Sequence, residues 1–242
     1  MNKLKFSKSN LLFTVSLSAL ILLTGCAFLK GLNAIYNKDV KPKHITYKEK
    51  SVILTPLTHF GQAEYYDSLK DSIVHWKKLG YVIFYEGVML NPAKMEVDST
   101  TADVTIRKWR KINGGIGITS EDYVKALNGV FKNKMAQPEY KELGIDSADF
   151  RTDITLVVLV SELEKLYGSV DLDSCDYSTH LDSTYTCGKK LKRNQDPIII
   201  AFRNKYVVEQ VIKSDQKRIV VLYGAWHMKG MKKLLRDDEL SK

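Results

Sequence analysis

Two apolar runs on either side of a helical stretch decide the fold: Ser51-Val-Ile-Leu-Thr55 and Tyr81-Val-Ile-Phe-Tyr85, with residues 62–79 between them. Both runs are rich in β-branched and aromatic residues, which is typical of buried strands. The stretch between them has apolar residues at helical spacing, namely Tyr66, Leu69, Ile73 and Trp76. Gly80 suits the position just after the end of a helix. Strand, helix and strand within some thirty residues predict a βαβ unit with parallel strands.

The rest of the chain continues this alternation. Arg218–Tyr223 is the last predicted strand and Lys229–Leu235 the last predicted helix. Further helices are predicted over Thr101–Ile112, Ser120–Lys132, Phe150–Tyr167 and Lys205–Lys213. We therefore expect an α/β fold, with a central, mostly parallel sheet flanked by helices, in a single domain.

The first 25 residues have the pattern of a secretory signal. Lys3, Lys5 and Lys8 precede the apolar run Leu11–Leu23, which has 13 residues and is followed by Thr-Gly-Cys26. That run is short of the roughly 20 residues that a membrane-spanning helix needs. The segment resembles the lipobox of bacterial lipoproteins, whose chain is cut before a lipidated cysteine. We expect a signal peptide over residues 1–25 and a lipid on Cys26.

Charge and composition suggest how the exported chain is arranged. Residues 26–48 are polar and basic and are predicted to tether the domain over 49–242 to the membrane. The whole chain carries a formal net charge of +9, and removal of the signal leaves +6, because it takes away three lysines and no acid. Basic residues are scattered among acids, which excludes an extended nucleic-acid surface. No acid follows Cys26, so by resemblance to lipoprotein sorting we expect the outer membrane.

Cys175 and Cys187 are the cysteines that remain after lipidation. An even pair in an oxidising compartment predicts a disulfide. The alternative is a metal cluster of both cysteines with His180, but zinc sites usually pair close ligands at each end, and these spacings do not.

Three polar residues follow predicted strands. His59 ends the stretch that begins at Ser51, Glu86 follows Tyr81–Tyr85, and His227 lies in Tyr223-Gly-Ala-Trp-His227. Since ligands bind at the carboxyl ends of parallel strands, we expect these three side chains to share one site. Histidine can ligate metal or move protons near neutral pH. The alternatives are loop histidines bonded to backbone carbonyls and an exposed acid that caps a helix.

Arginines and other residues give weaker signals. Arg203 follows the apolar run Ile198–Phe202, and its planar fork suits a carboxylate or an oxyanion formed in acyl transfer; a structural pair with Glu86 or Glu209 is the alternative. His75 is predicted to be solvated, as are Arg107 and Arg110 on a helix face. The chain has no Gly-x-Ser-x-Gly, which argues against a serine hydrolase of that type.

Together these residues resemble the TraB/GumN family, which is grouped with TIKI metalloproteases and erythromycin esterases. The resemblance rests on strand–turn–His59, Glu86 on the next strand, Arg203-Asn before a helix, and Gly224-Ala-Trp-His227-Met-Lys-Gly230. The family's first motif is also Gly-x-x-His, and here Pro56 stands where that glycine would be.

The resemblance implies a hydrolase site of His59, Glu86 and His227, with Arg203 beside it. These residues would hold a divalent metal or orient a water directly, and the substrate would be a peptide or an ester. The alternative is a non-catalytic lipoprotein that binds haem, a metal or an envelope partner. In either case the membrane, reached through lipidated Cys26, is the predicted partner.

Overall fold

A five-stranded sheet lies at the centre of the protein, with the strand order β1-β2-β7-β4-β6. The computed structural model describes residues 41–88, 97–114, 134–181, 183–187 and 195–240, without the side chains of the last two. The strands are β1 (Lys43–Tyr47), β2 (Lys50–Leu57), β7 (Arg218–Gly224), β4 (Val82–Tyr85) and β6 (Phe150–Arg151). β1 joins β2 antiparallel, and the other three pairs are parallel. The predicted α/β class with a mostly parallel sheet is confirmed.

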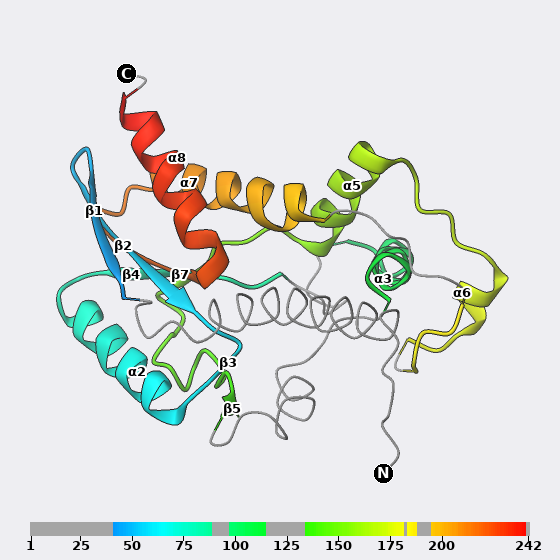
Figure 1. The fold of residues 1–242 in the computed structure, drawn as a ribbon, viewed down its shortest axis with the longest axis horizontal. Helices are drawn as coiled ribbons and strands as arrows, with labels where there is room; N and C mark the ends of the chain where they lie inside the picture. The colour runs from blue at the N-terminus through cyan, green and yellow to red at the C-terminus, as the bar shows by residue number, and fades with distance from the viewer. Residues whose placement is uncertain (1–40, 89–96, 115–133, 182, 188–194, 241–242) are drawn as a thin grey trace, which may run out of the picture. The chain divides into compact units, whose positions relative to one another are not determined.

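Helices cover both faces of this sheet (Figure 1). On one face, α7 (Arg203–Lys213) and α8 (Met228–Leu240) pack on alternate strand residues such as Val52, Leu54 and Val221. On the other face, α2 (Ala63–Lys78) packs on the residues between them, which include Ile53, Val220 and Leu222. Successive side chains of a strand point to opposite faces. Burial of both faces explains why these strands are continuously apolar.

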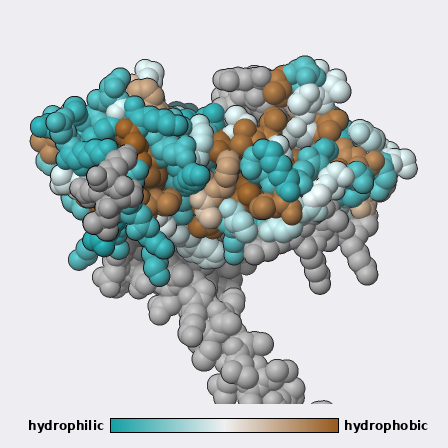
Figure 2. Space-filling view, turned by 90° about the horizontal axis from the view of Figure 1, so that it is seen from above, coloured by the Kyte–Doolittle hydropathy of each residue, from teal (hydrophilic) through white to brown (hydrophobic). Residues whose placement is uncertain are grey.

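A second core lies beside the sheet. It is formed by α3 (Ser99–Asn113), α5 (Leu156–Tyr167) and a single π-helical stretch, η2 (Pro197–Phe202), which runs directly into α7. The surface seen from the side of α5, α7 and α8 is hydrophilic at one end, with hydrophobic residues gathered toward the middle (Figure 2). Val158 and Leu166 of α5 are among the exposed apolar side chains. No described helix has the length and hydropathy needed to cross a membrane.

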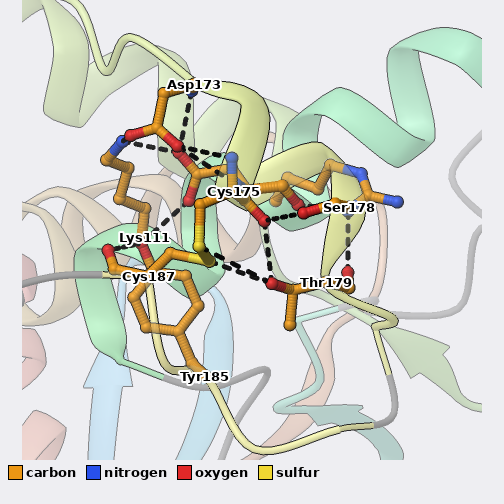
Figure 3. Close-up of polar contacts among 9 residues, drawn as sticks. Lys111, Asp173, Cys175, Ser178, Thr179, Tyr185 and Cys187 are labelled. Carbon is orange, nitrogen blue, oxygen red and sulfur yellow. Dashed lines mark hydrogen bonds and ion pairs between the residues drawn. A yellow bond between two sulfur atoms is a disulfide. The ribbon is translucent and has the colours of Figure 1, made fainter.

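The cysteine-containing segment is joined to α3. Cys175 lies in the short helix α6 (Ser174–Ser178) and is bonded to Cys187, with Cα atoms 5.5 Å apart. Lys111 of α3 binds the two carboxylates of the α6 capping box, Asp173 and Asp176 (Figure 3). The segment was predicted to be a loop, and its first part is helical because this capping box satisfies the free N–H groups of its first turn.

The sequence predicted that Arg107 and Arg110 lie on a solvated helix face. The structure contradicts this prediction. Arg110 is only 2% exposed and donates to the backbone oxygens of His180 and Ser183 at 2.8 and 2.6 Å. Arg107 donates to the oxygen of Thr179 at 3.1 Å. These carbonyl groups belong to a segment outside regular secondary structure, and the guanidinium groups supply their hydrogen-bond donors.

Two other expectations about local structure were wrong. The tether was predicted to run to residue 48, but Lys43–Tyr47 is the edge strand β1, in which Ile45 and Tyr47 turn inward. Basic residues are common on edge strands, where they discourage pairing with other chains, so a polar composition did not exclude a strand. The predicted helix Phe150–Tyr167 begins only at Leu156, because Thr155 caps it and Phe150–Arg151 pairs with β4.

Several predictions concern residues outside the described ranges. The signal peptide, lipidated Cys26 and the helix over 120–132 all fall there.

Candidate functional site

The carboxyl ends of three neighbouring strands bring the predicted site residues to one edge of the sheet. β7 lies between β2 and β4, so that Leu57 is opposite Gly224 and Tyr85 is opposite Leu222. The N–H of Glu86 continues this pairing to the oxygen of Leu222 at 3.0 Å. His227 follows three residues after β7 in the one-turn helix η3 (Ala225–His227).

Glu86 belongs to a buried ion network. Its Oε1 accepts from Arg203 Nη2 at 2.7 Å, and its Oε2 accepts from the N–H of Gly224 at 2.6 Å. Arg203 also forms a two-pronged contact with Asp153, in which Nε and Nη2 donate to Oδ1 and Oδ2 at 3.0 and 2.6 Å. Asp153 Oδ2 accepts from the N–H of Gly87 at 3.0 Å. Nε and Nη2 of Arg203 are therefore engaged with two carboxylates, and Nη1 lies 3.5 Å from the oxygen of Ile199.

The charges of this network are unequal, because one guanidinium faces two carboxylates. Burial raises the pKa of Glu86, but Arg203, His227 and the N–H of Gly224 outweigh it, so the pKa is lowered. Burial lowers the pKa of Arg203, yet Asp153 and Glu86 raise it above its ordinary value. One guanidinium is thus shared by two buried carboxylates, an excess of one negative charge.

His227 is buried against this network. Its Nδ1 lies 2.7 Å from Asn204 Oδ1, and its Nε2 lies 3.8 Å from Glu86 Oε1. An amide oxygen only accepts, so Nδ1 carries the proton and Nε2 keeps its lone pair. Burial is the main cause that lowers the pKa of His227 to about 4, although Glu86 opposes it. His227 is thus a neutral imidazole whose Nε2 lone pair lies beside a carboxylate.

Two glycines of the stretch Gly224–Gly230 make room for these contacts. A Cβ on Gly224 would lie 3.2 Å from Glu86 Oε2 and crowd the carboxylate. A Cβ on Gly230, in α8, would lie 2.3 Å from Asn204 Nδ2, which no side chain can tolerate without movement. One glycine therefore admits the carboxylate, and the other admits the amide that orients His227.

His59 lies in a different environment. It is exposed, and its Nδ1 is 2.9 Å from Gln137 Oε1. The contact is fixed by a two-stranded sheet of β3 (Phe60–Gly61) and β5 (Met135–Ala136), and by the Gln137 N–H, which donates to the His59 oxygen at 3.0 Å. Gln137 also hydrogen-bonds Tyr140, whose pKa is raised by burial and by the charge of Glu86.

The structure brings Glu86, Arg203 and His227 into contact and leaves His59 at the margin. The charge of His59 still contributes to the lowered pKa of His227. Among the residues that the structure describes, no group of three or more His, Cys, Asp or Glu side chains is arranged to hold a metal ion. His75 is exposed on α2, as predicted.

Sequence reasoning missed Asp153 and Gln137, and it quoted Asn204 without giving it a role. Asp153 follows a strand of two residues, which is too short to show a pattern. Gln137 carries no signal of its own. Asn204 could have been found, since it stands beside Arg203 at the start of a helix, four residues before Val208 of the buried face.

Searches of protein-family models, of curated proteins and of solved structures each found no match to this chain. The resemblance to the TraB/GumN family accordingly stays a prediction.

Proposed function

We propose that this chain is an exported, lipid-anchored hydrolase in which His227 activates a water that attacks a peptide or ester carbonyl. The observation that carries the proposal is the 3.8 Å separation of His227 Nε2 and Glu86 Oε1. Both atoms are acceptors, so a proton donor is favoured beside them, within hydrogen-bond reach of each. A water there would donate to Nε2 and keep its oxygen available for attack.

The buried excess of negative charge supports this chemistry. As the water oxygen bonds to the carbonyl carbon, its proton passes to Nε2 and His227 becomes an imidazolium. That cation offsets the uncompensated charge of Glu86, Arg203 and Asp153. Stabilisation of this kind acts when charge develops in the transition state, and not in the resting site. Asn204 would hold the ring in the required tautomer throughout.

The other predicted residues take different roles in this proposal. Nε and Nη2 of Arg203 are engaged by Glu86 and Asp153, so we assign it the positioning of Glu86 in place of the oxyanion contact first expected. His59 is exposed with Nδ1 held by Gln137. The Gln137 oxygen places the proton of this ring on Nδ1, so we assign His59 Nε2 the role of an acceptor toward the substrate, and the imidazolium of His227 gives its proton to the leaving group.

The donor set does not fit a divalent metal. Both oxygens of Glu86 are taken, one by a guanidinium and one by a backbone N–H. A cation beside Arg203 would meet a fixed positive charge. We therefore route no step through a metal, and a chelator should leave turnover unchanged.

Substitution of His227 tests the proposal. A panel of nitrophenyl esters and fluorogenic peptides identifies a substrate for the full-length chain. His227→Gln should then lose about a hundredfold or more in kcat, since a direct base typically contributes that much. Asn204→Ala should lose less, and His75→Ala, on the exposed face of α2, should match wild type. Turnover that survives in His227→Gln would overturn the mechanism.

The anchor is tested separately. Cells that express wild type and Cys26→Ser are fractionated into soluble and membrane material. We expect the wild-type chain in the membrane fraction and the variant in the soluble one. Equal retention of both would contradict lipidation of Cys26.

A further inference from the structure

Trp226 is the most exposed of the large apolar side chains that the structure describes. It is 66% exposed, whereas Trp76 and Trp109 are 8% and 9% exposed. Tryptophan is usually well buried, because its ring contributes a large apolar area. The exposure of Trp226, one residue before His227 of the candidate site, therefore calls for an explanation.

The turn that carries Trp226 is anchored at both ends. Gly224, two residues before it, donates to Glu86 at 2.6 Å, and His227, directly after it, binds Asn204 at 2.7 Å. Between these anchors, Trp226 belongs to the one-turn helix η3. Its exposure follows from a fixed backbone that directs the ring outward while His227 is directed inward.

Trp226 also lies on a segment that packs against β2, the strand that leads to His59. η3 packs against β2, and the chain leaves β2 toward exposed His59. Strand β7 pairs with β2 up to Leu57 and Gly224, so the segments of both histidines leave the sheet at one level. The indole is thus exposed on the same one-turn helix that carries buried His227.

We propose that Trp226 is a substrate-binding residue that stacks on a ring with an apolar face, carried by the substrate beside the bond to be cleaved. The proposal rests on the proposed function and names a substrate class for it. The flat face of an indole is best covered by another flat apolar face. Both an aromatic side chain and a sugar ring offer one, and the two are separated by experiment.

Binding of small ring compounds to the full-length chain tests this without turnover. The probes are N-acetyl-L-phenylalaninamide, methyl β-D-glucoside and N-acetylglycinamide, which lacks a ring. Acrylamide quenching of intrinsic fluorescence reports mainly on Trp226, because the other two tryptophans are buried. We expect one ring compound to protect the emission and N-acetylglycinamide not to protect it. Whichever ring compound protects identifies the ring type.

Variants complete the test through saturation-transfer NMR of the same compounds. Trp226→Ala should weaken ring binding about tenfold, which is the scale of one aromatic contact, and Trp226→Phe should retain most of it. His227→Gln should bind the ring like wild type while losing turnover, so failure of the chemistry and failure of this inference are distinguishable.

Two results would overturn the inference. One is equal binding of the ring compounds by wild type and Trp226→Ala. The other is protection of Trp226 only by vesicles of phosphatidylethanolamine and phosphatidylglycerol, with no effect of the ring compounds. That second result would make Trp226 a membrane-contact residue.

Discussion

His227 and His59 leave neighbouring strands of one sheet, and each holds a side-chain amide oxygen at Nδ1, yet their surroundings are opposite. His227 is 4% exposed and leans on Asn204, Glu86 and, edge to face, Tyr223. His59 is exposed, and the contact described for its ring is the one with Gln137. Similar local sequence thus gives one histidine whose chemistry is set by a buried network and one whose chemistry is set by solvent.

The difference arises from what surrounds each strand end. β7 is an inner strand, with β2 and β4 on either side and α7 and α8 packed over it. The chain that leaves β2 runs outward instead, into the two-stranded sheet with β5. If this contrast is real, substitutions on the His227 side should change stability and chemistry together, and substitutions on the His59 side should change chemistry alone.

The largest effect is expected at Arg203. Arg203→Met leaves two buried carboxylates without their cationic partner, and loss of one member of a buried pair costs about 3–5 kcal/mol. Arg203→Lys keeps the charge but cannot reproduce the two-pronged contact with Asp153, so it should also unfold more easily. Urea denaturation gives the free energy of unfolding. The control is Lys217→Met, which removes an exposed pair with Glu49 and should unfold like wild type.

The contrast is sharpened by the pH dependence of stability. The pKa of His227 falls from an ordinary 6.5 to about 4 in the folded chain, mainly through burial. Between these pH values the unfolded chain binds a proton that the folded chain does not. The stabilisation is complete above pH 6.5 and is lost as the pH falls toward 4, by about 3 kcal/mol.

Variants of the two histidines show which of them causes this loss of stability. His227→Gln should have a flatter dependence of unfolding free energy on pH between 6.5 and 4, and His59→Gln should keep the wild-type dependence. Equal slopes for wild type and His227→Gln would show that His227 is not held neutral by burial. Below pH 4.5 a further loss is expected from Glu86, whose pKa is lowered.

Gly230→Ala disturbs the same half of the site through packing. Its Cβ would meet Asn204 Nδ2 at 2.3 Å, so Asn204 must move away from His227. Overpacking of this kind costs about 1–3 kcal/mol, and turnover should fall as well, since the ring loses its partner. Lys233→Ala, on the exposed part of the same helix, is the matched control. Wild-type stability and turnover in Gly230→Ala would mean that the contact is not needed.

The buried half of the site could be predicted further than the exposed half. Apolar runs that end in Glu86 and in the Gly224–His227 turn indicated strands, and parallel strands with both faces covered fix where their ends meet. Asp153 could not be found in this way, because its strand has two residues and its partner is 50 positions away. The sequence left a pair with Glu86 open beside an oxyanion role for Arg203, and the structure shows that pair. The second partner, Asp153, depends on the long-range contact.

For His59 the sequence indicated the strand but not the surroundings. β3 and β5 have two residues each, which is below the length at which alternation can be recognised. Pro56 could be read only as a departure from a motif. In the structure the carbonyl oxygen of Pro56 accepts from the hydroxyl of Tyr65 at 2.7 Å. Pro56 belongs to strand β2 and lies opposite Tyr223 of β7.

The smallest expected effect, and the one that isolates the exposed half, is that of Gln137→Ala. The change removes the oxygen at Nδ1 of His59 and the bond to Tyr140, but it opens no buried ion pair. We expect the free energy of unfolding to stay within about 0.5 kcal/mol of wild type. Turnover should fall several-fold, because a His59 ring that rotates freely presents the Nε2 acceptor to the substrate only part of the time. Gln137→Glu, which keeps an acceptor oxygen, should recover much of the rate. If Gln137→Ala instead destabilises the chain as Gly230→Ala does, the two halves are held alike, and the division between a buried and a solvent-governed histidine fails.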